Sequence, residues 1–312
     1  MNDLTFASAK VQWSSAAISD CASVPLKALR VGTSGDRYVV VAGVHGNETT
    51  PLYVLRRFLE ETEHTEACTI DIIPVVNVLG VALGTRREPL CGEDMNRLLL
   101  AQAPDSVARQ VMSDLVKFCA EAEVVVDLHC WDSPSAVIGI CHRAPVSGPS
   151  RELRVLASFG CDYVWIPGSE DGIEGTLGQE LTRLGIANCA IELPAPGSVD
   201  RRGVGDFSKR LRKALVGPHS RCQLRCGQRE AIHAVAAGLY DPLVSAGEDV
   251  NQGTCLGRFL DPGTLAVQGV ASSHCTGILM DHAGRRVVHR GEVVAHIGTG
   301  GDDLSASIAE VN

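Results

Sequence analysis

The sequence lacks the features that mark membrane, secreted and nucleic-acid-binding proteins. No apolar run approaches the length needed to cross a bilayer, and the N-terminus shows no basic region, apolar core and small-residue cleavage site in succession. Positive charge is scarce, because 28 lysines and arginines stand against 37 aspartates and glutamates, for a net charge of −9. Neither nucleic acid nor an anionic membrane would attract such a chain. We therefore expect a cytoplasmic protein with neither of these partners.

No Cys-x-x-Cys pair is present, although the chain contains 12 cysteines. In a chain without a secretory signal, scattered cysteines are more often reduced and buried than joined in disulfides. Cys91 and Cys130 lie beside candidate site residues, but packing as small apolar side chains is favoured there over thiolate catalysis.

The sequence does contain a histidine and a glutamate three residues apart, at the end of an apolar run. The run 38–42 is typical of a buried strand, and the glycine after it indicates where the strand leaves the sheet. Ligands of α/β proteins bind at such strand ends. In a helical turn, His45 and Glu48 would share one face and could bind one metal ion. A catalytic zinc needs three protein ligands, so a third must come from elsewhere in the chain.

A second apolar run, 124–126, leads into Asp127-Leu128-His129. His45, Glu48 and His129 form a set of two histidines and a glutamate, as in many zinc hydrolases. An isolated histidine at a strand end is more often structural, but the glycines around His45 and its acidic partner favour a metal. Asp127 shares a strand face with His129 and could accept the second ring N–H of a ligand histidine.

Two further polar segments complete the candidate site. The loop 84–97 presents guanidinium groups and an amide, which are groups that hold a carboxylate or a developing oxyanion. Glu192 is a lone acid near the end of an apolar run that starts near Ile186. Burial would raise the pKa of such an acid and suit it to acid–base catalysis.

Together these residues resemble the succinylglutamate desuccinylase/aspartoacylase family, a branch of the zinc carboxypeptidase superfamily. The matching motifs, in the family's order, are Gly43-Val44-His45-Gly46-Asn47-Glu48 with Pro51, Gly84-x-Arg86-x-x-Pro89, Asp94-Met95-Asn96-Arg97, Asp127-Leu128-His129 and Glu192. They cover roughly the first two thirds of the chain. The chain departs from the family at Asn77-Val78, where Asn-Pro is frequent, and at Leu98-Leu99-Leu100, where an aromatic-Pro-Gly often stands. These departures affect the shape of the pocket and leave the metal ligands unchanged.

The resemblance implies one zinc ion per chain, bound by His45, Glu48 and His129. It implies that Glu192 activates the attacking water. The expected activity is that of a zinc-dependent amidohydrolase, which removes an acetyl- or succinyl-type acyl group from a small N-acyl amino acid.

The resemblance also assigns substrate contacts within the loop 84–97. Arg86 corresponds to the oxyanion-stabilising arginine, although Arg87 beside it leaves that assignment open by one residue. Asn96 and Arg97 correspond to the clamp on a substrate carboxylate. Two alternatives remain open: a zinc carboxypeptidase acting on short peptides, and a metal-free binding protein without catalysis. The identity of the acyl group and amino acid depends on loops such as 131–135 and 170–175.

The alternation of elements predicts an α/β fold. Apolar strands are expected at 38–44, 68–76, 123–129, 136–141, 162–166 and 186–192, with helices at about 50–63, 104–122, 147–159 and 175–185. Strands that alternate with helices indicate a mostly parallel or mixed sheet with helices on both faces, as in zinc carboxypeptidases.

After about Gly217 the pattern changes to short β-like runs between glycines, at 231–237, 253–260, 276–280, 286–288 and 293–297. We therefore divide the chain into a catalytic domain, 1–217, and a β-rich module, 218–312. The module resembles the barrel-sandwich domains of lipoyl and biotinyl carriers, but no lysine for attachment occurs between Cys226 and Gly300. The module could cover the site or mediate assembly, and the sequence does not choose between these roles. The protein could also form a homo-oligomer, of which a dimer is the commonest kind.

Overall fold

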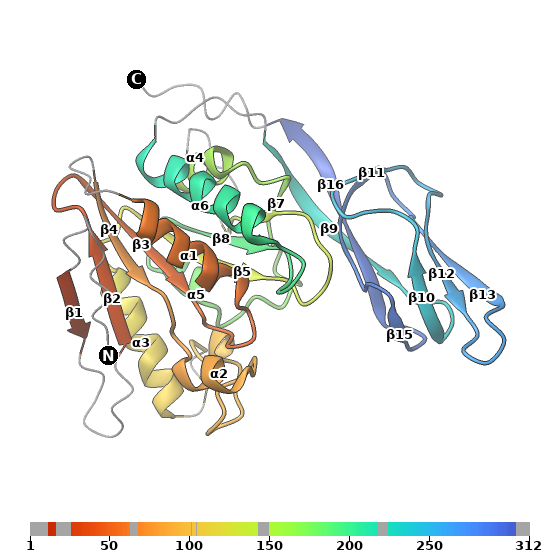
Figure 1. Ribbon diagram of the computed structural model, residues 1–312, viewed down its shortest axis with the longest axis horizontal. Helices are drawn as coiled ribbons and strands as arrows, with labels where there is room; N and C mark the ends of the chain where they lie inside the picture. The colour runs from red at the N-terminus through yellow and green to blue at the C-terminus, as the bar shows by residue number, and fades with distance from the viewer. Residues whose placement is uncertain are drawn as a thin grey trace.

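The computed structural model describes residues 12–16, 26–62, 68–100, 102–103, 105–142, 150–217 and 224–303. In this part of the chain, a 12-stranded mixed sheet carries helices on both faces, and a separate four-stranded sheet lies at its C-terminal end (Figure 1). In spatial order the large sheet consists of β1 (Gln12–Ala16), β2 (Leu26–Val31), β4 (Cys68–Ile73), β3 (Asp36–Ala42), β5 (Val124–Cys130), β8 (Asn188–Leu193), β6 (Ile138–Ile140), β7 (Tyr163–Trp165), β9 (Arg225–His233), β16 (Val293–Asp303), β14 (Gly277–His282) and β11 (Asp249–Val250).

The centre of the large sheet is parallel, from β4 through β3 and β5 to β8. Every residue of β5 is buried, and β3 is buried from Tyr38 onward. Such continuous apolar runs are typical of parallel strands that are covered on both faces. Val40 belongs to the core on one face of the sheet, and Val39 and Val41 belong to the core on the other. The predicted α/β class with a mixed, helix-covered sheet is confirmed.

The helices are α1 (Thr50–Glu61), α2 (Val78–Leu83), the 3-10 turn η1 (Met95–Arg97), α3 (Val107–Cys119), α4 (Arg151–Phe159), α5 (Leu177–Arg183) and α6 (Arg201–Val216). Helices α1, α4 and α6 pack together on one face, and α3 and α5 cover the other (Figure 1). The apolar periodicity predicted α1, α3, α4 and α5. Helix α2 was not predicted because it is only six residues long, and α6 was not predicted because Gly203 and Gly205 interrupt its first turns.

The C-terminal strands form a two-layered sandwich. The four-stranded sheet contains β13 (Val267–Ser272), β12 (Cys255–Leu260), β10 (Gly238–Pro242) and β15 (Arg286–Val288), all antiparallel. Its buried side chains pack against those of β9, β14 and β16 around Phe259 and Leu279. The predicted small all-β unit is therefore present. Of the strand expected at 231–237, only residues 231–233 are in a strand, at the end of β9 (Arg225–His233), and 234–237 form a bend instead.

The junction between the two parts was not predicted. Strand β9 pairs in parallel with β7, so the C-terminal strands extend the sheet of the first part. The proposed boundary between residues 217 and 218 adjoins the segment 218–223, which lies outside the described residues, and the division stays a prediction. Within the described ranges, no helix is long and apolar enough to span a membrane.

A buried carboxylate joins three strands at the edge of the parallel region. Asp71 on β4 accepts hydrogen bonds from Arg30 on β2, at 2.6 and 2.8 Å, and from Arg37 on β3, at 2.7 Å. The Asp71 side chain is 0% exposed. Burial alone would raise the pKa of Asp71, but the two guanidinium groups outweigh burial and lower it. The carboxylate form therefore contributes to the stability of the sheet.

Replacing Asp71 by asparagine is expected to lower the free energy of unfolding by about 2–4 kcal/mol at neutral pH, because two arginines lose their buried counter-charge. The folded-state pKa of Asp71 is depressed, so its contribution is present above the pKa of an unfolded aspartate and is lost as the pH falls through the folded-state value. Denaturant titrations at neutral and acidic pH measure both effects. Asp206→Asn, at an exposed site, should change stability by less than about 0.5 kcal/mol; an equal loss in both variants would contradict the assignment.

Candidate active site and metal centre

The candidate residues meet where the parallel strands end. His45 is the third residue after the end of β3, His129 is the sixth residue of β5, and Glu192 is the fifth residue of β8. Strands β5 and β8 are paired in a register that sets His129 opposite Glu192. Because β3, β5 and β8 are parallel, their carboxyl ends lie at one edge of the sheet, the usual place for a ligand site in this fold class.

A tight turn places His45 and Glu48 on the same side. The Glu48 N–H donates to the His45 carbonyl at 3.3 Å, and the helix begins only at Thr50, so the expected helical turn is a non-helical one. Gly43 has a φ of +62°, and a Cβ there would lie 3.0 Å from the Val75 Cα. At Gly46 a Cβ would lie 2.0 Å from the main-chain carbonyl carbon of Gly80. Only glycine fits these positions, which explains the two glycines of the motif.

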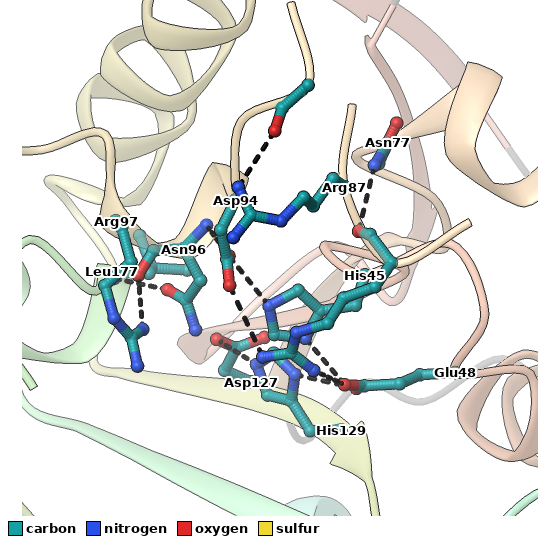
Figure 2. Close-up of polar contacts among 12 residues, drawn as sticks. His45, Glu48, Asn77, Arg87, Asp94, Asn96, Arg97, Asp127, His129 and Leu177 are labelled. Atoms are coloured by element: carbon teal, nitrogen blue, oxygen red, sulfur yellow. Dashed lines mark hydrogen bonds and ion pairs between the residues drawn. The ribbon is translucent and has the colours of Figure 1, made fainter. Parts of the chain in front are cut away.

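His45, Glu48 and His129 form one compact, buried group (Figure 2). Nδ1 of His45 lies 2.6 Å from Oε1 of Glu48, and Nδ1 of His129 lies 2.9 Å from Oε2 of the same carboxylate. The Cys130 main-chain N–H also donates to Oε2 at 3.1 Å and fixes its position. One ligand atom from each residue lies within 4.8 Å of the others.

Each histidine is oriented by an aspartate behind it. Nε2 of His129 lies 2.9 Å from Oδ2 of Asp127, and Nε2 of His45 lies 3.1 Å from Oδ1 of Asp94 (Figure 2). Such carboxylate–histidine pairs hold the ring so that its other nitrogen faces the metal. Two imidazole nitrogens and one carboxylate, oriented in this way, fit the three-ligand set of a catalytic zinc.

The electrostatics of the group favour a positive charge. Burial alone would raise the pKa of Glu48, but His129 and His45 outweigh it and hold the pKa well below its usual range. Burial lowers the pKa of both histidines, whereas the neighbouring carboxylates raise it. The carboxylates outweigh burial, so the pKa of each histidine is raised, and that of His129 is raised strongly. Acidic groups thus surround the two rings, which is the condition that attracts a cation to a site.

Glu192 lies on the strand beside His129 and lines the same cavity. Burial raises the pKa of Glu192 to about 7, with Glu48 acting in the same direction and His129 opposing it. An acid in that range can both accept and return a proton near neutral pH. The sequence prediction of a desolvated acid at this strand end agrees with this environment.

The two neighbouring arginines have different surroundings. Arg86 lines the cavity, donates through Nη1 to Oε1 of Glu48 at 3.0 Å, and lies 3.5 Å from Oδ2 of Asp94. Arg87 instead donates to the main-chain carbonyl of Gly92 at 2.9 Å, within its own loop. These contacts favour Arg86 for a role at the reacting group, and that role stays a prediction.

Asn96 and Arg97 line the cavity from η1. The Asn96 carboxamide oxygen accepts from the Leu177 N–H at the start of α5 at 2.9 Å, which leaves the amide NH₂ as its donor group. Arg97 is exposed, and its Nη1 donates to the Asn96 carbonyl at 2.6 Å (Figure 2). Both side chains therefore present donors, as expected for a carboxylate clamp.

All seven predicted site residues border one cavity of about 240 Å³. It extends from the His45–Glu48–His129 group along β5, β8 and α5 and reaches strand β9. The loops expected to influence specificity contribute Trp131 and Asp132 from the first, and Asp171 and Ile173 from the second.

Two residues of the site were not predicted from the sequence. Asp94 begins the motif Asp94-Met95-Asn96-Arg97 but was assigned no role, and its position two residues before Asn96 is the signal that could have indicated one. Arg229 on β9 lines the cavity from the C-terminal part of the chain. No motif surrounds Arg229, because its placement depends on the pairing of β9 with β7.

Comparisons with solved structures show the same fold over nearly the whole chain. A succinylglutamate desuccinylase/aspartoacylase from Rhodobacter sphaeroides is 21% identical with a TM-score of 0.75, covering 97% of this chain and 99% of its own. The product-bound ectoine utilization protein EutE (DoeB) from Ruegeria pomeroyi is 17% identical with a TM-score of 0.75, covering 93% and 94%. An aspartoacylase family protein from Mesorhizobium loti is 18% identical with a TM-score of 0.72, covering 96% and 98%. No curated protein matches the chain by sequence.

The family model for the succinylglutamate desuccinylase/aspartoacylase catalytic domain matches residues 34–215, more than half of the chain. This range contains the His45, Glu48 and His129 group and Glu192. The chain therefore belongs to the succinylglutamate desuccinylase/aspartoacylase family, and its His–Glu–His group fits the zinc-type metal site of that family.

Proposed function

We propose that this protein is a zinc-dependent amidohydrolase that removes an acetyl- or succinyl-type acyl group from a small N-acyl amino acid. The observation that carries the proposal is the placement of Glu192 directly across from His129 on the neighbouring strand, beside the three candidate ligands. The three candidate metal ligands and the acid Glu192, whose pKa is raised to about 7, therefore border one small cavity.

His45, Glu48 and His129 would hold the zinc, which when bound supplies Lewis-acid activation of water and of the scissile carbonyl. Glu192 accepts the proton of the attacking water and returns it to the departing amine. Arg86 donates to the oxygen that becomes negative as the carbonyl carbon turns tetrahedral. Asp94 and Asp127 keep the histidine rings oriented throughout.

The size of the cavity supports a small substrate over a peptide. About 240 Å³ suits an acylated amino acid, and Arg229 of the C-terminal part contributes to the wall. A carboxypeptidase acting on short peptides needs room for residues that precede the cleaved bond. The alternative of a metal-free binding protein predicts that a metal ligand or the catalytic acid has been lost. This chain has all three candidate ligands and the acid Glu192.

The test combines elemental analysis of the purified protein with amine release from a panel of N-acetyl and N-succinyl amino acids. We expect close to one zinc per chain and turnover of one or two members of the panel. Zinc without turnover would direct the search to peptides. No bound metal, together with no activity after zinc is added, would refute the proposal.

Arg97→Ala is expected to raise KM for a carboxylate substrate by roughly 10–100-fold with a smaller change in kcat, because a charge-assisted hydrogen bond to the bound substrate is lost. Steady-state kinetics on the best panel substrate measure the effect. Arg87→Ala is the matched control in the same loop, where the guanidinium bonds its own backbone. An unchanged KM for Arg97→Ala, or a larger rise in KM for Arg87→Ala, would show that Arg97 does not bind the substrate carboxylate.

A further inference from the structure

The loop that follows β5 forms part of the cavity wall, and the C-terminal strands fix its path. It begins with Trp131, which lines the cavity. Further along the loop, the Ala136 N–H donates to the Met280 carbonyl at 2.8 Å, and the Pro134 carbonyl accepts from the His282 N–H at 3.1 Å. The end of this loop is therefore paired with β14, so the wall of the cavity depends on the sandwich.

Trp131 lies next to the reacting groups. Its main-chain N–H donates to the Leu193 carbonyl of β8 at 3.0 Å, so the pairing of β5 with β8 continues to this residue. Alternate side chains of an extended chain point to the same side, which places Trp131 on the side of His129, just beyond the end of β5. Glu192 lies across from His129 on β8. The indole therefore borders the cavity beside the expected position of the scissile bond.

A histidine of the C-terminal sandwich packs against the Trp131 ring. The centroid of the His296 ring, on β16, lies 6.1 Å from that of the indole, and the two planes are inclined by 42°. His296 is held in turn by Asp281 on β14: its main-chain N–H donates to Oδ1 of Asp281 at 2.9 Å, and its Nδ1 lies 2.8 Å from the same oxygen. The side chains of His296 and Asp281 are 18% and 10% exposed. Packing against a ring that is fixed by hydrogen bonds restricts the orientation of the indole.

The wall around Trp131 is apolar. Trp131, Ile140 and Ile173 line the cavity and pack against a small core at the junction of the two parts. This core consists of Ala136, Ile138, Tyr163, Trp165, Ile278 and Met280. An apolar wall suits the alkyl part of an acyl group, because the carboxylate of the amino acid is expected at Asn96 and Arg97, which present donors.

We propose that His296 and Asp281 are positioning residues for Trp131, and that the indole held by them limits the length of the acyl group. This inference rests on the proposed deacylase function and deepens it, because it assigns the selection of acyl length to one side chain. An indole that is free to turn admits longer chains, whereas an indole held in place excludes the chains that extend past it.

Two substrates that differ by four methylenes in the acyl group test the limit. They are the N-acetyl and N-hexanoyl, or the N-succinyl and N-suberyl, derivatives of the amino acid that the panel identifies. For the zinc-loaded full-length protein, we expect kcat/KM to favour the shorter acyl group by at least about 10-fold, a factor that a pocket reaches for a single methylene. Trp131→Ala should reduce this preference by roughly 10-fold. Equal kcat/KM for both substrates in the unmodified protein, or an unaltered preference in Trp131→Ala, would overturn the limit.

A double-mutant cycle separates positioning from a general structural effect. His296→Ala should reduce the preference by roughly 3–10-fold in the unmodified background and leave it unchanged in the Trp131→Ala background, because its effect passes through the indole. Asp281→Asn should act in the same direction by a smaller factor, since its amide oxygen still accepts the His296 main-chain N–H. His274→Ala, at an exposed position of the same sandwich, is the matched control and should leave the preference unchanged. An effect of His296→Ala that is equal in both backgrounds, or absent from both, would overturn the positioning role.

A binding measurement keeps the limit testable apart from turnover. Acetohydroxamate and hexanohydroxamate carry the same zinc-binding group and differ by four methylenes. Calorimetry on the zinc-loaded protein should show tighter binding of acetohydroxamate, by a factor that Trp131→Ala and His296→Ala both reduce. Circular dichroism establishes whether the His296 variant is folded, and His296→Gln replaces it if it is not. Equal or tighter binding of hexanohydroxamate by the unmodified protein would refute the limit. A lack of turnover with the acetohydroxamate preference intact would refute only the deacylase function.

Discussion

Glu192→Gln is expected to lower kcat by roughly 10²–10⁴-fold while the protein keeps its zinc and its fold. Glutamine has nearly the same shape as glutamate but cannot accept a proton from water at neutral pH. Glu192 lies outside the His45, Glu48 and His129 group, so metal binding should persist. The measurement is kcat on the best panel substrate, with zinc content determined on the same preparation.

The control for this prediction is Glu174→Gln, which changes an exposed acid in a loop near the cavity. It should retain normal turnover. If Glu192→Gln turns over at nearly the normal rate with zinc bound, another group must move the proton. If instead the zinc is lost, Glu192 contributes to metal binding and the division of roles is wrong.

His129→Ala should lose both metal and activity. The substitution removes one of three ligand donors. It leaves the buried Asp127 carboxylate without its imidazole partner and the buried Glu48 carboxylate with His45 as its remaining one. Loss of an outer partner of a metal ligand typically weakens metal affinity 10–100-fold, so loss of the ligand itself should exceed about 100-fold. Competition with a chelator measures the affinity, and elemental analysis measures the stoichiometry.

His289→Ala, at an exposed position in the C-terminal sandwich, is the matched histidine control and should bind zinc normally. Circular dichroism establishes whether the His129 variant is folded, and His129→Gln offers a more conservative change if it is not. Stoichiometric zinc with unchanged affinity in a folded His129→Ala protein would reject the ligand assignment.

The candidate metal group was readable from the sequence because its geometry is mostly local. His45 and Glu48 are three residues apart in a turn that two glycines force, and Asp127 and His129 alternate along one face of a strand. Strand ends could be placed because the apolar runs of a buried parallel sheet are continuous. The rule that parallel strands end at the same edge then brought the two pairs together.

The division of roles between the two adjacent arginines was decided only by tertiary structure. Arg86 and Arg87 have identical side chains and adjacent positions, and no periodicity distinguishes them. Packing of α2 and its loop against the Gly43–Gly46 turn sends Arg86 to Glu48 and Asp94, and Arg87 to Gly92. Such contacts depend on the path of a loop, which local propensity does not encode.

The sequence by itself determined the α/β class, the three candidate ligands, the candidate acid Glu192 and the change near Gly217 from alternating strands and helices to short β-like runs. Tertiary structure alone decided that the C-terminal strands continue the large sheet and that Arg229 enters the cavity. The physical reason is range: turns and strand alternation follow from neighbouring residues, whereas the pairing of β7 with β9 joins segments about 60 residues apart through backbone hydrogen bonds that carry no side-chain signature.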